Sequence, residues 1–101
     1  MSKKYKIEYL PVSEQDLTEI IEYILLDHPD AALSMLNQFD ESISILEIFP
    51  NSGVIPNDIR LQSLGYRMLV IDNYLVFYAV IEETVEIRRI LHSKRKYNFL
   101  L

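Results

Sequence analysis

The C-terminal third of the chain has the pattern of three consecutive β-strands. From Gly65 to Tyr97 most residues are Val, Ile, Leu, Tyr and Phe, which fit a pleated, half-buried surface. Two short polar links, Asp72-Asn73 and Glu82-Glu83, divide this stretch and predict tight turns. Because Asn and Asp tolerate positive φ, the first link favours a type I′ hairpin. The pattern therefore predicts a β-meander.

The first half of the chain predicts one strand followed by two amphipathic helices. Polar and apolar residues alternate from Lys4 to Leu10, as in a half-buried strand, and Pro11 ends this pattern. Ser13 is a suitable N-cap, so we expect the first helix over about Glu14 to Leu26. Pro29 suits the first position of a second, antiparallel helix. The apolar stripes expected to be buried are Leu17, Ile20, Ile21, Ile24 and Leu25 in the first helix, and Ala32, Met35, Leu36, Phe39, Ile43 and Leu46 in the second.

Three less regular segments complete the chain. Phe49 to Gly53 stops the second helix, and Val54 to Ser63 is irregular, with Ile59-Arg60-Leu61 read as either a short strand or an extended loop. Asn98 to Leu101 is expected to form one helical turn that packs on the core. The order β-α-α-β-β-β predicts one α+β domain over residues 1–101, with an antiparallel helical hairpin on one face of a mostly antiparallel sheet.

The side-chain faces of the predicted sheet depend on the strand register. With two-residue turns at both links, one face carries Arg67, Leu69, Ile71, Val76, Tyr78, Val80, Val85, Ile87, Arg89 and Leu91. The opposite face then carries Tyr66, Met68, Val70, Leu75, Phe77, Glu86, Arg88 and His92. The first set is more apolar and fits the helix-covered face, but a slip of one residue at either turn would reverse part of this assignment.

The composition argues against several classes of site. The chain has no cysteine, and therefore no disulfide, thiolate metal site or cysteine nucleophile. Its two histidines, His28 and His92, are distant in sequence and lack clustered carboxylates, so we expect no metal and no cofactor. The sequence has neither a signal-peptide pattern nor an apolar run long enough to cross a bilayer. We therefore expect a cytoplasmic protein without membrane contact.

Charge is divided unevenly along the chain. Residues 1–50 contain three lysines and ten acidic residues, which gives −7, whereas residues 51–101 contain seven basic and five acidic residues, which gives +2. The predicted helices are thus acidic and the end of the predicted sheet is basic. Basic and aromatic side chains gather in this last part: Arg88, Arg89, His92, Lys94, Arg95, Lys96 and Tyr97.

Several ordered motifs carry a resemblance to a known family. They are Phe49-Pro50-Asn51-Ser52-Gly53, Leu64-Gly65-Tyr66-Arg67, Tyr74-Leu75-Val76-Phe77-Tyr78 and Val85-Glu86-Ile87-Arg88-Arg89-Ile90-Leu91-His92. In their order and spacing the sequence resembles the RelE/ParE superfamily, the small growth-inhibiting toxins of type II toxin–antitoxin modules, which include plasmid-stabilisation systems. The last two motifs are more similar to the ParE branch than to RelE proper.

The resemblance implies two alternative activities and one shared partner. ParE-like members resemble inhibitors that bind DNA gyrase, and they offer no catalytic set to transfer. RelE-like members resemble metal-independent endoribonucleases that cleave mRNA on the ribosome. Both kinds are neutralised by a cognate antitoxin, so a chain that only binds its antitoxin is a third alternative. The slightly favoured interpretation is gyrase inhibition.

The ribonuclease alternative assigns roles to named residues. By resemblance, Arg67 matches the arginine of the family's Gly-Tyr-Arg, Arg95 matches the arginine after the last strand, and Arg60 matches a loop lysine, while a second loop lysine is missing near Gln62. These cations would hold a phosphate during attack by the 2′-hydroxyl. His92 would be a general acid or base.

Each of these residues also has a structural interpretation. Arg67 is equally well explained as a solvated strand-end arginine or as a partner in an ion pair with one of the many acidic residues, and His92 as a cap of the last strand or a contact of Tyr97. Arg89, Lys94, Arg95 and Lys96 either bind phosphates or an acidic partner, or form a solvated basic surface. Tyr97 either stacks on a base or anchors the C-terminal turn.

Overall fold

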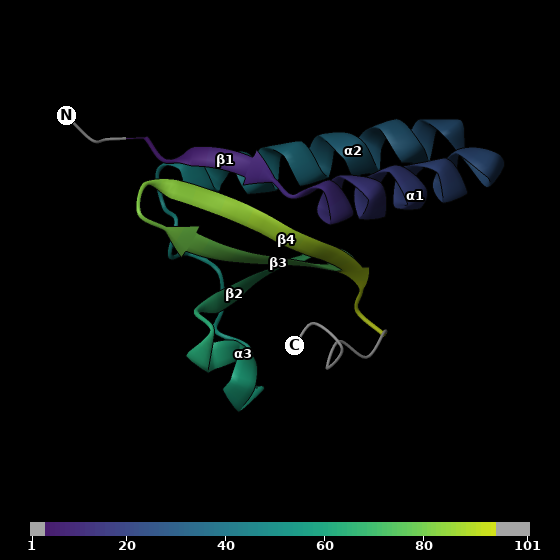
Figure 1. Ribbon diagram of the computed structural model, residues 1–101. Helices are drawn as coiled ribbons and strands as arrows, with labels where there is room; N and C mark the ends of the chain where they lie inside the picture. The colour runs from purple at the N-terminus through teal and green to yellow at the C-terminus, as the bar shows by residue number, and fades with distance from the viewer. Residues whose placement is uncertain (1–3, 95–101) are drawn as a thin grey trace.

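The chain folds into a four-stranded sheet with a helical hairpin on one face, as the computed structural model in Figure 1 shows. The structure describes residues 4–94. The elements are β1 (Lys6–Tyr9), α1 (Pro11–Asp27), α2 (Pro29–Ser44), the 3₁₀ helix η1 (Ile45–Glu47), α3 (Ile59–Ser63), β2 (Tyr66–Ile71), β3 (Tyr74–Ile81) and β4 (Thr84–His92). The sheet order is β1-β4-β3-β2, in which only the β1–β4 pair is parallel. The α+β prediction is confirmed, whereas the helical turn expected at residues 98–101 lies outside the described residues.

Each helix of the hairpin begins at a proline. Pro11 is the first residue of α1, so the prediction that Ser13 caps this helix is wrong. Proline suits this position because it lacks an N–H and its φ is fixed near the helical value. Ser13 is instead fully buried in the first turn, where its hydroxyl donates to the Leu10 carbonyl at 2.8 Å. Pro29 begins α2 as expected. Neither helix, nor any other in the described part of the chain, has the length and apolar character needed to cross a membrane.

The sheet has a core on each face. The larger core lies between the sheet and the hairpin and includes Phe39, Ile43, Leu46, Val76, Tyr78, Val85, Ile87 and Ile90. The smaller one is built from Leu61, Tyr66, Leu75, Phe77 and Leu91, and lies on the side of α3 in Figure 1. The segment from Ile59 is therefore a short helix, and the prediction of a strand or extended loop there is wrong. Its helical start is stabilised by the Asp58 carboxylate, which accepts from the N–H groups of Arg60 and Leu61.

A β-bulge in β4 changes which residues face the helices. Both two-residue links are confirmed, but within each link only the first residue has positive φ, Asp72 (53°) and Glu82 (55°), so the first link is not a type I′ turn. Phe77 pairs with Arg89 and Tyr78 with Ile87, which leaves Arg88 as the extra residue. Beyond the bulge, Ile90 packs toward the hairpin and Leu91 toward α3. The prediction that Leu91 shares the helix-covered face is therefore wrong.

A buried tyrosine fixes the loop that follows η1. The Tyr78 hydroxyl donates to the Pro50 carbonyl at 2.8 Å and accepts from the Gly53 N–H at 2.9 Å. A Cβ atom at Gly53 would lie 2.5 Å from that hydroxyl, so only glycine fits there. The loop next pairs with the sheet through a bridge between Val54 and Met68. The Pro-x-x-Gly motif is thus explained by close packing against β3.

The first prediction tests this contact. Tyr78→Phe is expected to lower the free energy of unfolding by about 2 kcal/mol, because it leaves the Gly53 N–H and the Pro50 carbonyl unpaired in the interior. Urea unfolding followed by circular dichroism measures this change. The control, Tyr23→Phe, removes the hydroxyl of a side chain that is 71% exposed, so it should change stability by less than about 0.5 kcal/mol. Equal stability of Tyr78→Phe and the wild type would contradict the interpretation.

Candidate functional site

Arg67 is held by the loop that Tyr78 also fixes. Its Nη1 atom donates to the carbonyls of Asn51 at 3.1 Å and Gly53 at 3.0 Å, and the residue is half-buried. The guanidinium of the Gly-Tyr-Arg motif thus binds two backbone carbonyl oxygens of this loop. These contacts to backbone carbonyls differ from both structural alternatives for Arg67, a solvated side chain and an ion pair.

Arg89 forms a bidentate ion pair with Asp16 at the start of α1. Its Nε lies 2.7 Å from Oδ2 of Asp16 and its Nη2 lies 3.0 Å from Oδ1. The hydrogen bond to Asp16 raises the pKa of Arg89, although burial acts in the opposite direction. Arg89 therefore remains charged and joins the last strand to the first helix.

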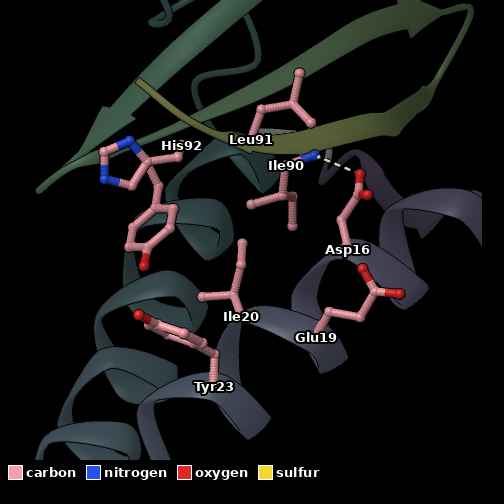
Figure 2. A pocket seen from close by; sticks show the side chains of 8 residues that line it. Asp16, Glu19, Ile20, Tyr23, Ile90, Leu91 and His92 are labelled. Carbon is pink, nitrogen blue, oxygen red and sulfur yellow. Dashed lines mark hydrogen bonds between the residues drawn. The ribbon is translucent and has the colours of Figure 1, made fainter. Parts of the chain in front are cut away.

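The Asp16 carboxylate also accepts a backbone hydrogen bond that a neighbouring strand would otherwise accept. Parallel pairing with β1 ends at Ile87, which pairs with Tyr9, so β4 continues beyond its neighbour. The Ile90 N–H then donates to Oδ2 of Asp16 at 3.0 Å, a contact that Figure 2 shows as a dashed line. Because Asp16 accepts both a backbone N–H and the Arg89 guanidinium, it is buried without an unpaired charge.

The other predicted site residues lie in different parts of the fold. Arg60 is exposed on α3, with its Nε 3.8 Å from an oxygen of Asp58. His92 is exposed at the end of β4, where its Nδ1 accepts from the Lys94 N–H at 3.2 Å and its ring packs edge-on against Tyr74. Lys94 is exposed, and Arg95, Lys96 and Tyr97 lie outside the described residues. The cap interpretation of His92 agrees with its contact to Lys94, and the contact expected with Tyr97 lies outside the described residues.

A groove between α1 and the end of β4 is the main concave feature beside these contacts. It has a volume of about 490 Å³ and is lined by Asp16, Glu19, Ile20, Tyr23, Tyr74, Ile90, Leu91 and His92. Figure 2 shows the α1 side chains directed toward β4, as their spacing of three and four residues along one helix face requires. The sequence analysis missed this groove because Glu19 and Tyr23 have the pattern of a solvent-exposed helix face.

The surroundings of the groove are strongly acidic. Residues 11–47, which form the hairpin and η1, contain nine acidic residues and no lysine or arginine. Burial, followed by the charge of Asp72, raises the pKa of Tyr74 above its ordinary value of 10.0, so its phenol is neutral at physiological pH. Within residues 4–94, no group of three or more His, Asp or Glu side chains is arranged to hold a metal ion. The groove therefore offers carboxylates, the neutral phenol of Tyr74 and apolar surface.

Comparison with known proteins identifies the family. Residues 7–97 match the family described as the ParE toxin of the type II toxin–antitoxin system, parDE. The chain belongs to the ParE toxin family. No curated protein matches the sequence. The RelE/ParE resemblance of the sequence motifs is thereby confirmed.

Two solved structures share the fold of this ParE-family chain at low sequence identity. A chain of the chromosomal ParDE system from P. aeruginosa is 18% identical, with a TM-score of 0.76, and the match covers 90% of this chain and 98% of that one. A chain of the toxin–antitoxin complex RelBE2 from Mycobacterium tuberculosis is also 18% identical, with a TM-score of 0.61 and coverage of 88% and 98%. At this identity the likeness shows the fold alone.

The second prediction concerns the contact between Asp16 and β4. Asp16→Ala is expected to lower the free energy of unfolding by about 3 kcal/mol, because it leaves Arg89 and the Ile90 N–H without their acceptor in a mostly buried place. A double-mutant cycle with Arg89→Ala should give a coupling energy above about 1 kcal/mol. Urea unfolding measures all four proteins, with Glu22→Ala as an exposed acidic control. Additive effects of the two substitutions would show that the ion pair does not join α1 to β4.

Proposed function

We propose that this ParE-family chain is a cytoplasmic, growth-inhibiting toxin that binds its target rather than cleaving it, with DNA gyrase as the target. The observation that carries the proposal is the engagement of Arg67 and Arg89 in contacts that maintain the fold. A metal-independent ribonuclease stabilises a developing phosphate charge with cations directed at one point. Here Arg67 donates to loop carbonyls and Arg89 to a carboxylate on α1, which favours binding over catalysis.

The surface properties support a protein target over RNA. The chain carries a net charge of −5, which disfavours approach to a polyanion. Residues 48–57 form a run of ten uncharged residues, in which Ile48, Phe49, Val54 and Ile55 are at least half exposed. Aromatic and apolar side chains without charge are typical of the central part of protein–protein interfaces.

A cognate antitoxin is the second partner that we propose. The solved structures of similar fold are described as a ParDE system and a RelBE2 toxin–antitoxin complex. The sequence supports such a partner with two regions of opposite charge, the acidic hairpin and the basic residues that follow β4. An antitoxin segment that covers both would add a helix or a strand to this fold.

The alternative is a ribosome-dependent mRNA endoribonuclease that uses Arg67, Arg95 and His92. The exposed position of His92 beside Lys94 favours this alternative, because a general acid or base must reach its substrate. It predicts that Arg67→Ala and Arg95→Ala each reduce cleavage by about 100-fold. Cleavage of mRNA by the folded wild type, lost in both variants, would replace the gyrase proposal.

The third prediction separates the alternatives in cells. Induction of the protein alone is expected to arrest bacterial growth, with DNA synthesis failing before protein synthesis, because gyrase inhibition stops replication first. Pulse-labelling with thymidine and methionine measures the two rates. Protein synthesis failing first would contradict the gyrase target. Normal growth in cells that contain folded protein would indicate an inactive module that only binds an antitoxin.

The fourth prediction concerns the rate of antitoxin binding. Association is expected to be about 10-fold faster at low than at high ionic strength, because charges on the two surfaces steer the encounter and salt screens them. Stopped-flow fluorescence with the cognate antitoxin measures the rate. An association rate independent of salt would show that charge does not guide this partner.

A further inference from the structure

We propose that a cavity between the helical hairpin and the turn that joins β2 to β3 binds a guanidinium group. The cavity has a volume of about 360 Å³, and its lining includes Ser34, Met35, Gln38, Asp72, Asn73 and Tyr74. This volume is near the lower end of the range of roughly 300–1,000 Å³ that is typical of small-ligand sites. The cavity shares Tyr74 with the groove beside β4 and is otherwise lined by different residues. Binding there does not depend on the proposed toxin function.

The polar groups of the cavity come from two segments that are far apart in the sequence. Ser34 and Gln38 are four residues apart on α2, so they lie on the same face of that helix. Asp72 and Asn73 are the two-residue link between β2 and β3. In the part of the chain that the structure describes, the side chains of Ser34, Gln38 and Asp72 form no hydrogen bond or ion pair. A ligand therefore competes only with water for these three groups.

The charge around the cavity favours a cation. Asp72 contributes a carboxylate that has no basic partner among the described residues. The neighbouring hairpin and η1, residues 11–47, contain nine acidic residues and no lysine or arginine. An arriving cation would therefore form the ion pair that the described part of the chain does not supply at Asp72. An anion would be repelled by the same charges.

The acceptor groups favour a guanidinium over an ammonium. A guanidinium presents five N–H donors in one plane, enough for the Asp72 carboxylate, the Ser34 hydroxyl and the Gln38 carbonyl together. The apolar part of the lining includes Met35, which is 7% exposed, and the half-buried ring of Tyr74. A flat, weakly hydrated guanidinium stacks on aromatic rings, and the methylene groups that carry it cover apolar surface. An ammonium is more strongly hydrated and has only three donors.

Four small probes test this chemistry on the full-length protein. Propylguanidine carries the group as a free small molecule, and arginine with blocked termini represents a side chain of another protein. Blocked lysine and blocked citrulline replace the guanidinium by an ammonium and by its uncharged isostere. In NMR titrations of the isotopically labelled protein, both guanidinium probes are expected to give saturable shifts at Ser34, Gln38 and Asp72. Blocked arginine should bind about 5-fold more tightly than blocked lysine or blocked citrulline.

A matched pair of variants tests the role of the carboxylate. Asp72→Asn removes the charge and suits the positive φ of 53° at this position, because Asn tolerates that conformation. This variant is expected to bind blocked arginine about 5-fold more weakly. Glu82→Gln makes the same change in net charge at the first position of the other link, where φ is 55°, and lies outside the lining. It should change binding by less than about 2-fold.

A second pair tests the acceptors on α2. Gln38→Ala should weaken binding of blocked arginine by about 3-fold through loss of one acceptor, whereas Asn37→Ala, the adjacent exposed residue outside the lining, should leave it unchanged. Circular dichroism of each variant confirms folding before these comparisons.

The relative affinities of the two guanidinium probes identify the source of the ligand. Tighter binding of propylguanidine supports a free small cation, and tighter binding of blocked arginine supports a side chain of a protein partner. Equal affinities for blocked arginine, lysine and citrulline would overturn the proposal. Equal losses in Asp72→Asn and Glu82→Gln, or the absence of saturable shifts in the wild type, would also overturn it.

Discussion

The position of the helical hairpin depends on one carboxylate. Because β1 is shorter than β4, Ile90 lies beyond the last paired residue of the parallel strands. Its N–H donates a hydrogen bond to the Asp16 carboxylate instead of to a neighbouring strand. The bulge at Arg88 adds one residue to β4, and the next residue, Arg89, pairs with the same carboxylate. One side chain near the start of α1 therefore joins the helix to the sheet and sets one wall of the groove. Loss of this contact would affect the fold and the candidate binding surface together.

A second contact holds the opposite end of the sheet. Tyr78 and Arg67 both bind the loop of residues 50–53, the first through its hydroxyl and the second through its guanidinium. Arg67, which the family resemblance offers for function, and Arg89, which the sequence offered as a binding residue, are therefore used by the fold, one at each contact. This is the physical reason to favour a toxin that acts by binding. The acidic hairpin is a separate feature that a partner can recognise by charge.

The sequence predicted the elements well because their signals are local. The alternation in β1, the position of Pro29 and the two polar links each depend on neighbouring residues, and the structure confirms them. The helical stripes are confirmed only in part, because Leu25 and Leu36, which were expected to be buried, are exposed. The bulge at Arg88 could not be predicted, because a single extra residue leaves the apolar pattern intact while it reverses the faces of the residues that follow. The same limit explains the wrong face assigned to Leu91 and the missed helix α3, whose five residues are too few for a periodic pattern.

The candidate site was predicted only as a set of residue types. The motifs named Arg67, Arg89 and His92 as catalytic or binding residues, and these roles stay predictions; the contacts that the structure shows are with Asn51, Asp16 and Tyr74, which come from other elements. The groove was missed for the same reason, since its lining combines one face of α1 with the ends of two strands. Only the tertiary arrangement brings Glu19 and Tyr23 opposite β4.

DNA supercoiling by purified gyrase, in the presence of this protein and then of its antitoxin, tests the central claim most directly. The account predicts that the wild-type protein inhibits supercoiling, that the antitoxin restores it, and that mRNA on translating ribosomes stays intact at the same protein concentration. Unchanged supercoiling together with cleavage of ribosome-bound mRNA by the folded protein would contradict it.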